Sequence, residues 1–391
     1  MRQIVSIYLD YNATSPIFPE VLEAMVQAQD SAIGNASSVH RYGQRARALV
    51  DDARSAVAAL IEADADEVVF TSGGTEAINL SLRGAFDALA AAGRKRIVVS
   101  AIEHEAVLNT ARALAARGAE VVVIQSNPDG VVQADDMAAA ITRDTALVSL
   151  MLANNEIGTI QPVAELARHC RELGVLVHTD AVQGAGKIAV SVRDLGVDLL
   201  SISGHKFGGP KGVGALYVRR GTRVTAQATG GRQERNRRAG TENVPGLAGL
   251  GVAARLARES LAHGVSIAGK RDQLERSILN TVAGTVANGG AAPRVPNTSN
   301  ISFDGVEAES LLIALDLEGI AVSTGSACSS GSLEPSHVLR GMGLPNSRAR
   351  NSIRFSLGAR TTDLELDVVA SRLPDLVAKL RRIGKPMEAV R

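Results

Sequence analysis

Two oppositely charged side chains close neighbouring apolar runs of the sequence. Asp180 ends the run Val175–Asp180, and Lys206 follows the run Leu199–Ser203 in the segment Ser203-Gly204-His205-Lys206. If both runs are buried strands, each charge needs a partner, because burying an unpaired charge is costly. Two interpretations are open at this point: a salt bridge between Asp180 and Lys206, or a ligand that satisfies both charges.

A glycine turn supplies a third feature. Thr71-Ser72-Gly73-Gly74-Thr75 follows an apolar run and opens an amphipathic segment, so backbone N–H groups and a hydroxyl are placed where a phosphate docks. The same turn is equally typical of plain helix capping. Pyridoxal phosphate satisfies all three features: its aldehyde condenses with a lysine, its ring nitrogen pairs with an acid, and its phosphate takes a helix N-terminus. The combination predicts that cofactor.

Cys328 is one of only two cysteines in the chain, the other being Cys170. It lies in the run Ser323–Ser332, which is made of small residues that cannot build a packed wall around a thiol. We therefore expect an exposed, reactive thiol on a movable loop. Taken alone, such a segment is more typical of a flexible turn that happens to carry a cysteine.

Three other functional motifs are incomplete or missing in this sequence. Gly184-Ala185-Gly186-Lys187-Ile188 is similar to a phosphate-binding P-loop but has Ala181 in place of the first glycine and Ile188 in place of the hydroxyl residue. His104-Glu105 lacks the second histidine of a zinc protease, because that position is Leu108. A strand followed by GxGxxG is also missing from the sequence.

These residues require a scaffold, and the middle of the chain predicts one. Short β-branched runs alternate with Ala/Leu-rich helical stretches, which indicates a mainly parallel sheet between helices. The predicted strands are Glu67–Thr71, Arg96–Ser100, Ala119–Ile124, Thr145–Met151, Val175–Asp180, Leu199–Ser203 and Gly214–Val218. The predicted helices are Thr75–Ala92, Ala106–Arg117, Ala134–Ile141 and Pro162–Leu173. The continuously apolar runs Ile97–Val99 and Val121–Ile124 are expected to be buried on both faces.

The two ends of the chain suggest a second, smaller unit. A long helical stretch near Pro245–Ala283 leads out of the sheet, and the sequence from Asn297 onward predicts strand, helix, strand, loop, helix, strand, helix. We expect a large domain over residues 15–254, and a small α+β domain formed by residues 1–14 together with 255–391.

Composition excludes several function classes. With 42 basic and 41 acidic side chains in 391 residues, no electrostatic reason exists to expect nucleic acid or an anionic membrane as a partner. Aromatic residues make up only 3%, which argues against base stacking. No clustered cysteines or histidines suggest a metal, and no apolar run approaches the ~18 residues of a membrane span. The cytoplasm is the expected location.

In their order along the chain, the polar motifs resemble those of a known family. They are Tyr8–Thr14, Gly34–Ser38 with His40, Phe70–Glu76, Asn154–Gly158, His178–Gln183, Ser203–Lys206, Arg237–Asn243 and Arg354–Gly358. Nearly end to end, the sequence resembles cysteine desulfurases of the NifS/IscS type, which are pyridoxal-phosphate enzymes. The resemblance implies the aspartate-aminotransferase-like transferase fold, with a mainly parallel seven-stranded sheet in the large α/β domain and a smaller α+β domain.

The resemblance also implies roles for individual residues around the cofactor. Lys206 is similar to the lysine that holds the cofactor, and Asp180 to the partner of its ring nitrogen. His104 would stack on the ring and help move protons, and Gln183 would bind the ring hydroxyl. The residues that resemble phosphate ligands are Gly74, Thr75, Ser203 and His205, with Thr241 reaching the phosphate of a partner subunit in a homodimer.

For the substrate, Asn155 and Arg354 resemble the clamp on a carboxylate, and Cys328 the cysteine that accepts sulfur. The implied reaction converts L-cysteine to L-alanine, leaves a persulfide on Cys328 and passes the sulfur to an iron–sulfur scaffold or another acceptor protein. The acceptor stays open, with a slight lean toward the nitrogenase-associated branch. Alternatives are a selenocysteine lyase, a desulfurase dedicated to tRNA or DNA thiolation, and an inactive adaptor. A generic aminotransferase would have no use for a mobile cysteine.

Overall fold

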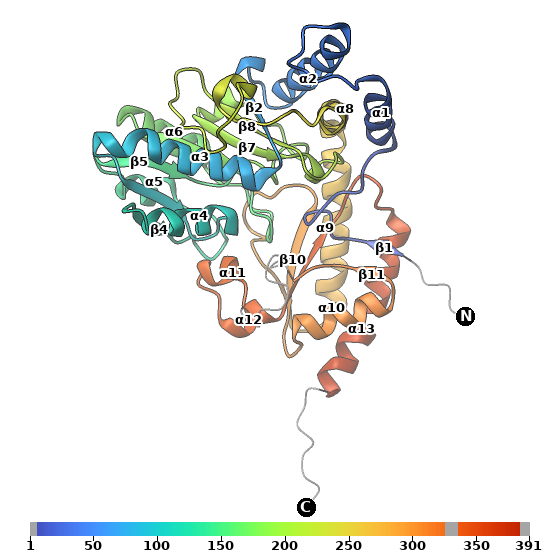
Figure 1. The fold of residues 1–391 in the computed structure, drawn as a ribbon. Helices are drawn as coiled ribbons and strands as arrows, with labels where there is room; N and C mark the ends of the chain where they lie inside the picture. Colours follow the sequence, from blue (N-terminus) through green and yellow to red (C-terminus); the bar gives the residue numbers. More distant parts are fainter. Residues whose placement is uncertain (1–5, 325–334, 384–391) are drawn as a thin grey trace, which may run out of the picture.

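A seven-stranded sheet forms the centre of the molecule in the computed structural model, which describes residues 6–324 and 335–383 (Figure 1). Its strands are β2 (Val68–Thr71), β3 (Arg96–Ser100), β4 (Glu120–Ile124), β5 (Thr145–Ser149), β6 (Leu176–Asp180), β7 (Leu199–Ser203) and β8 (Gly214–Val218). They lie in the order β2-β8-β7-β6-β5-β3-β4. Neighbours are parallel except at β8, which runs antiparallel to β2 and β7. All seven predicted strands are therefore present, and the predicted fold class is confirmed.

Helices cover both faces of this sheet because its strands alternate apolar side chains between them. Ile97 and Val99 of β3 pack in one core cluster with α3 and α4, whereas Val98 packs in another with α2, α5, α6 and α8. The helices are α2 (Arg41–Leu60), α3 (Gly74–Leu89), α4 (Glu105–Ala115), α5 (Ala134–Ala139), α6 (Val163–Glu172), α7 (Val192–Leu195) and α8 (Val244–Ser260).

One expectation about the sheet is wrong. Strand β4 was expected to be buried on both faces, but it is the edge strand, and the side chain of Val123 is 46% exposed. The valine run satisfies strand propensity without requiring a central position, because one covered face is enough to stabilise it.

The predicted helical stretch near Pro245–Ala283 is two helices. Helix α8 ends at Ser260, a 3₁₀ turn occupies Leu261–His263, and α9 runs over Gly264–Thr281. The break falls beside Gly264, and glycine is a poor helix former. Helices α1 (Pro19–Ser31) and α2 pack against α8, so the N-terminal helices lie on the large sheet's side of the molecule, as Figure 1 shows.

The second unit has its own core, which contains Ile7, Leu9, Ile301 and Phe355. Its elements are β1 (Ile7–Tyr8), β9 (Thr285–Ala287), β10 (Thr298–Phe303), α10 (Ala308–Leu317), β11 (Ile320–Ala321), β12 (Ser352–Ser356) and α13 (Asp363–Ile383), and α9 contributes Leu274 and Ile278 to the same core. Between β11 and β12 lie α11 (His337–Gly341) and α12 (Asn346–Arg350), whose buried residues Val338, Leu339 and Ala349 pack in the core of the large sheet. Strands β12-β10-β9 form an antiparallel sheet, and β1 pairs with β11 in parallel. Relative to the predicted order, β9 is additional and one helix is split into α11 and α12. The predicted domain boundary falls inside α8 and stays a prediction.

Across residues 6–324 and 335–383, no helix combines the length and the apolar character needed to cross a membrane.

Candidate active site

A cavity of about 390 Å³ opens at the carboxyl ends of the large sheet. Ligands of open parallel sheets bind at this edge. Most of the sequence-predicted site residues line it together: Gly74, Thr75, His104, Asn155, Asp180, Gln183, Ser203, His205, Lys206 and Arg354. Asp180 and Ser203 are the last residues of β6 and β7, and Arg354 comes from β12 of the second unit. The others come from the segments that follow β2, β3, β5, β6 and β7.

The glycine turn brings the start of α3 against the cavity. The Glu76 carboxylate accepts hydrogen bonds from the Ser72 backbone N–H (2.6 Å) and from Arg238 (2.8 Å), which fixes the turn. A Cβ atom added at Gly74 would lie 2.8 Å from Val182 Cγ2 and 3.4 Å from Ser203 Cβ. Only glycine leaves this space open, so the backbone N–H groups at the head of α3 border a pocket suited to a phosphate.

Asp180 is buried at the end of β6, with 4% of its surface exposed. Burial raises the pKa of its carboxyl to about 6, while a hydrogen bond from the Val182 N–H (2.9 Å) and the charge of Lys206 act in the opposite direction. A cationic ring nitrogen at this position would compensate the burial cost that the pKa reports.

Lys206 lies one strand away, on the 3₁₀ turn Gly204–Lys206 that follows β7. Its ammonium donates to the main-chain carbonyls of Asn12 (2.6 Å) and Ala13 (2.9 Å). Within the part of the chain that the structure describes, Asp180 and Lys206 do not form an ion pair within 4 Å. The salt-bridge interpretation of these two residues is therefore not the arrangement that the structure has.

The histidines at the cavity are held in the neutral form. His104 caps α4, and its Nδ1 accepts from the Ala106 N–H (3.0 Å), which requires the proton to be on Nε2. Burial and the charge of Lys206 lower the pKa of His104 to about 4. Burial, Lys206 and Lys211 lower the pKa of His205 to about 4 as well. A neutral ring at His104 suits stacking on an electron-poor aromatic ring.

Arg354 forms the wall contributed by the second unit and is 2% exposed. Its Nη2 donates to Asp10 Oδ1 (2.6 Å) and its Nη1 to the Asn155 carbonyl (2.9 Å), so the guanidinium is oriented by two partners. Its Nε and the Asn155 Oδ1 are buried and have no hydrogen-bond partner within the described residues. Such atoms are costly unless a ligand pairs with them.

The residues present fit pyridoxal phosphate and an amino-acid substrate. A lysine amine, a buried carboxylate, a neutral histidine and a glycine-lined helix N-terminus border one cavity, and two buried polar atoms beside it need a ligand. A phosphate, a pyridinium and a substrate carboxylate are the complementary groups.

The structure does not place two further predicted residues, Thr241 and Cys328, at this cavity. Thr241 is exposed and does not line the cavity of its own chain. Cys328 lies outside the described residues, but both flanks of its segment are tied to the site. Ser323 pairs with the Arg354 backbone, and Ser336 Oγ donates to Glu156 Oε2 (2.5 Å).

Sequence reasoning assigned no role to three residues beside the predicted ones: the half-buried Asp10, which pairs with Arg354, and the linked pair of buried Asn12 and half-buried Lys187. The polar residues Asp10 and Asn12, which come shortly after the strand Ile7–Tyr8, were the available signal.

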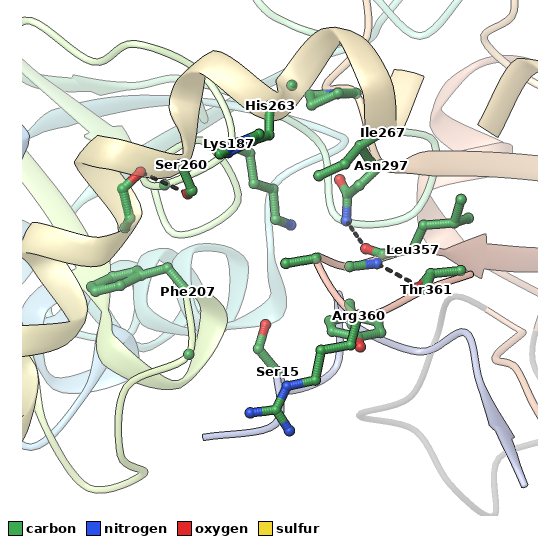
Figure 2. A pocket seen from close by; sticks show the side chains of 18 of the residues that line it. Ser15, Lys187, Phe207, Ser260, His263, Ile267, Asn297, Leu357, Arg360 and Thr361 are labelled. Atoms are coloured by element: carbon green, nitrogen blue, oxygen red, sulfur yellow. Dashed lines mark hydrogen bonds between the residues drawn. The ribbon is translucent and has the colours of Figure 1, made fainter. Parts of the chain in front are cut away.

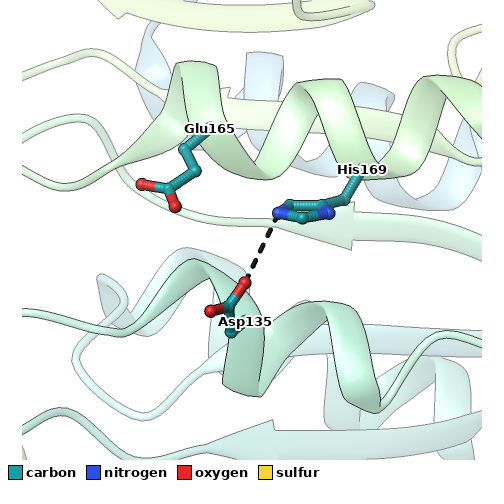
Figure 3. Close-up of side chains that lie close together, drawn as sticks. All are labelled: Asp135, Glu165 and His169. Atoms are coloured by element: carbon teal, nitrogen blue, oxygen red, sulfur yellow. Dashed lines mark ion pairs between the residues drawn. The ribbon is translucent and has the colours of Figure 1, made fainter.

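A separate group of metal-ligand types lies on α5 and α6, where the ligand atoms of Asp135, Glu165 and His169 fall within 4.8 Å of one another (Figure 3). Asp135 and His169 form an ion pair (3.5 Å), and none of the three lines the cavity.

Comparisons with known proteins agree with this geometry. Residues 7–369 match the aminotransferase class-V family. The chain is 47% identical over 379 residues to a cysteine desulfurase IscS of Dictyoglomus turgidum, covering 97% of this chain and 96% of the relative. It is 45% identical to a cysteine desulfurase of Gluconacetobacter diazotrophicus, covering 97% and 95%. A solved NifS-like protein superposes with a TM-score of 0.90 at 35% identity, covering 96% of this chain and all of that one. The NifS-like protein of Rickettsia africae gives a TM-score of 0.86 at 32% identity over the same shares. The chain therefore belongs to the class-V aminotransferase family, and within it to the cysteine desulfurases, which are pyridoxal-phosphate-dependent enzymes.

Proposed function

We propose that this L-cysteine desulfurase carries out its reaction in the cavity at the carboxyl ends of the large sheet. The observation that supports this most strongly is the convergence of Lys206, Asp180, the turn at Gly74 and the second unit's Arg354 on one cavity. Of the alternatives open from the sequence, neither a selenocysteine lyase, nor an enzyme dedicated to tRNA or DNA thiolation, nor an inactive adaptor is favoured by the family relationships.

Pyridoxal phosphate supplies an electron sink that makes the substrate Cα–H acidic. Lys206 would hold the cofactor, and Asp180 would pair with its ring nitrogen. The phosphate would take the N-terminus of α3 with Gly74 and Thr75, assisted by Ser203 and His205. Because its pKa is lowered to about 4, His104 would present a neutral ring to the cofactor at physiological pH.

For the substrate, Arg354 and Asn155 would bind the carboxylate of L-cysteine. Arg suits this role because its planar group binds a carboxylate through more than one N–H. The contact with Asp10 holds the guanidinium in place beforehand, which reduces the entropy lost on binding. Gln183 would bind the ring hydroxyl of the cofactor.

Lys206 would also act as the general base for the substrate Cα–H, because its amine borders the cavity that would hold the substrate. The Cys328 thiolate would attack the substrate sulfur. An S–S bond forms as the C–S bond of the substrate breaks. The electron pair of the C–S bond stays on carbon and is protonated there. The products are L-alanine and a persulfide on Cys328.

Substrate and sulfur acceptor follow from the family at a coarse level, and three finer assignments are proposals. The acceptor would be an iron–sulfur scaffold protein. The enzyme would act as a homodimer in which Thr241, exposed in one chain, reaches the phosphate in the partner's site. It would work in the cytoplasm, where thiols are kept reduced.

The two cysteines permit a matched test. Cys328→Ala should bind pyridoxal phosphate and show its visible absorbance but produce no protein persulfide and little alanine. Cys170→Ala is the control, because Cys170 is fully buried and burial raises the pKa of its thiol to about 12, so it is inert. Alanine and persulfide formed by Cys328→Ala at the rate of the unmodified enzyme would refute the proposed sulfur transfer. Lys206→Ala that still condenses with the cofactor would refute the site itself.

A further inference from the structure

Asn12 is a buried junction between the cofactor lysine and the rest of the site. Its main-chain carbonyl accepts from Lys206 Nζ (2.6 Å) and from Gln183 Nε2 (2.9 Å). The neighbouring carbonyl of Ala13 also accepts from Lys206 Nζ (2.9 Å). We call these two oxygens, Asn12 O and Ala13 O, the carbonyl pair.

The side chain of Asn12 is fixed from several directions. Its Oδ1 accepts from Lys187 Nζ (2.8 Å) and from Asn297 Nδ2 (3.0 Å), and its Nδ2 donates to Thr298 Oγ1 (2.9 Å). Lys187 Nζ also donates to Gln183 Oε1. Lys187 thus bridges the side chains of Asn12 and Gln183. Because both of those side chains are buried, a hydrogen bond lost there leaves an unsatisfied buried atom.

The number of protons on the Lys206 nitrogen decides whether it can donate to both oxygens of the carbonyl pair. An ammonium carries three N–H bonds, but a nitrogen bonded covalently to a carbonyl carbon carries at most one. Two donations from the same nitrogen are therefore possible only for the uncondensed lysine. The carbonyl pair therefore accepts Lys206 in its uncondensed form.

We propose that Lys187 and Asn12 are positioning residues that hold the carbonyl pair in place for the released amine of Lys206. This inference rests on the proposed function of Lys206. Lys187 would contribute through Asn12 and Gln183 and would touch neither the substrate nor the reacting atoms.

The surroundings of Lys187 fit such a role. Burial, followed by the charges of Lys206 and Arg354, lowers its pKa well below the usual range. Among the described residues, the charged or titratable groups that interact with Lys206 include Lys187, Asp180, His104 and His205. Lys187 also lines a second cavity of about 390 Å³ between the two units, which it shares with Lys206 and Lys270 (Figure 2).

Lys270 provides a matched control for the test. It lines the same second cavity, but its Nζ donates to the Thr361 carbonyl (2.8 Å) and contacts neither Asn12 nor Gln183. Lys187→Met and Lys270→Met each remove one lysine amine that lines this cavity. In the full-length chain, two quantities are measured: kcat and KM for L-cysteine, and the rate at which visible absorbance develops when the cofactor-free protein is mixed with pyridoxal phosphate.

For Lys187→Met we expect kcat and the condensation rate each to fall about tenfold, which is the order of effect of one lost buried hydrogen bond, with KM changed less than about twofold. The final absorbance per chain should be unchanged, and Lys270→Met should match the unmodified enzyme. Asn12→Ala removes the Oδ1 acceptor and retains Lys187, so it should reproduce the same pattern if Lys187→Met is too unstable to purify.

Unchanged kcat and condensation rate in either folded variant would overturn the proposal. So would loss of final absorbance at saturating pyridoxal phosphate, because that result would place the pair in cofactor binding. Lys206→Ala distinguishes an error in the positioning role from an error in the proposed function. If Lys206→Ala is colourless and inactive while Lys187→Met behaves like the unmodified enzyme, the proposed function stands and only the positioning role is wrong.

Discussion

Gly74 permits the sharpest prediction about the cofactor pocket. A methyl group added there would lie 2.8 Å from Val182 Cγ2, about 0.6 Å inside the 3.4 Å limit of ordinary van der Waals contact. It would also reach 3.4 Å from Ser203 Cβ. Because Gly74, Val182 and Ser203 all border the pocket, the strain falls where the phosphate would bind. Overpacking of this kind costs about 1–3 kcal/mol.

If that cost is borne by the pocket, Gly74→Ala should weaken binding of pyridoxal phosphate about 5-fold to 150-fold. The assay is titration of the cofactor-free protein with pyridoxal phosphate, followed by visible absorbance. Gly269→Ala is the control, because Gly269 lies within helix α9 and a Cβ added there meets no atom within 4 Å. The control should bind the cofactor normally and unfold at the same or a slightly higher temperature.

The result that refutes this reasoning is a Gly74→Ala protein whose dissociation constant lies within twofold of the unmodified value. A lowered melting temperature with unchanged affinity would do the same, since the strain would then be relieved away from the phosphate position.

Three further predictions follow from buried charges. Arg354→Lys should raise KM for L-cysteine at least tenfold while cofactor absorbance is retained, because a lysine cannot keep the contact with Asp10 and offer a planar fork to the substrate; steady-state kinetics check this. Glu103→Gln should flatten the pH dependence of stability, because burial raises the pKa of Glu103 to about 8. The stabilising contribution of Glu103 is present below about pH 4.5 and is lost as the pH rises through 8. The melting temperatures measured at pH 5 and pH 8 should therefore lie closer together in the variant than in the unmodified protein. Arg54→Met should destabilise the fold by about 3–5 kcal/mol in denaturant unfolding, because it leaves the buried Glu234 carboxylate unpaired; a loss below 1 kcal/mol would contradict this.

The large sheet was predictable because each of its strands is a local pattern. Leu199–Ser203 and Gly214–Val218 form strands with the predicted bounds, since a short apolar run ends at a polar or glycine residue in each. The cofactor side of the site followed from the same patterns. Parallel strands bring their carboxyl ends to one edge, so Asp180 and Lys206 had to approach each other wherever the sheet lay in the molecule.

What could not be predicted depends on contacts between distant segments. Asn12 makes hydrogen bonds to residues 155, 183, 187, 206, 297, 298 and 356, and no local periodicity encodes that set. The edge position of β4 was missed for the same reason, because a valine run reads alike at the centre and at the border of a sheet. The break at Leu261–His263 was missed although Gly264, a poor helix former, directly follows it.

The delivery of Arg354 by strand β12 has a consequence for synthesis. The segments of the same chain that would hold the cofactor, with the strand β8 that joins β2 to β7, have been translated once the ribosome has passed Val218. Arg354, the proposed substrate clamp, is translated roughly 140 residues later, about 7 to 30 seconds at typical elongation rates. On the proposed assignments, a nascent chain would hold the cofactor residues of its own site before it has the arginine that would bind an amino acid. Chemistry on free cysteine would then be withheld until strand β12 has been made.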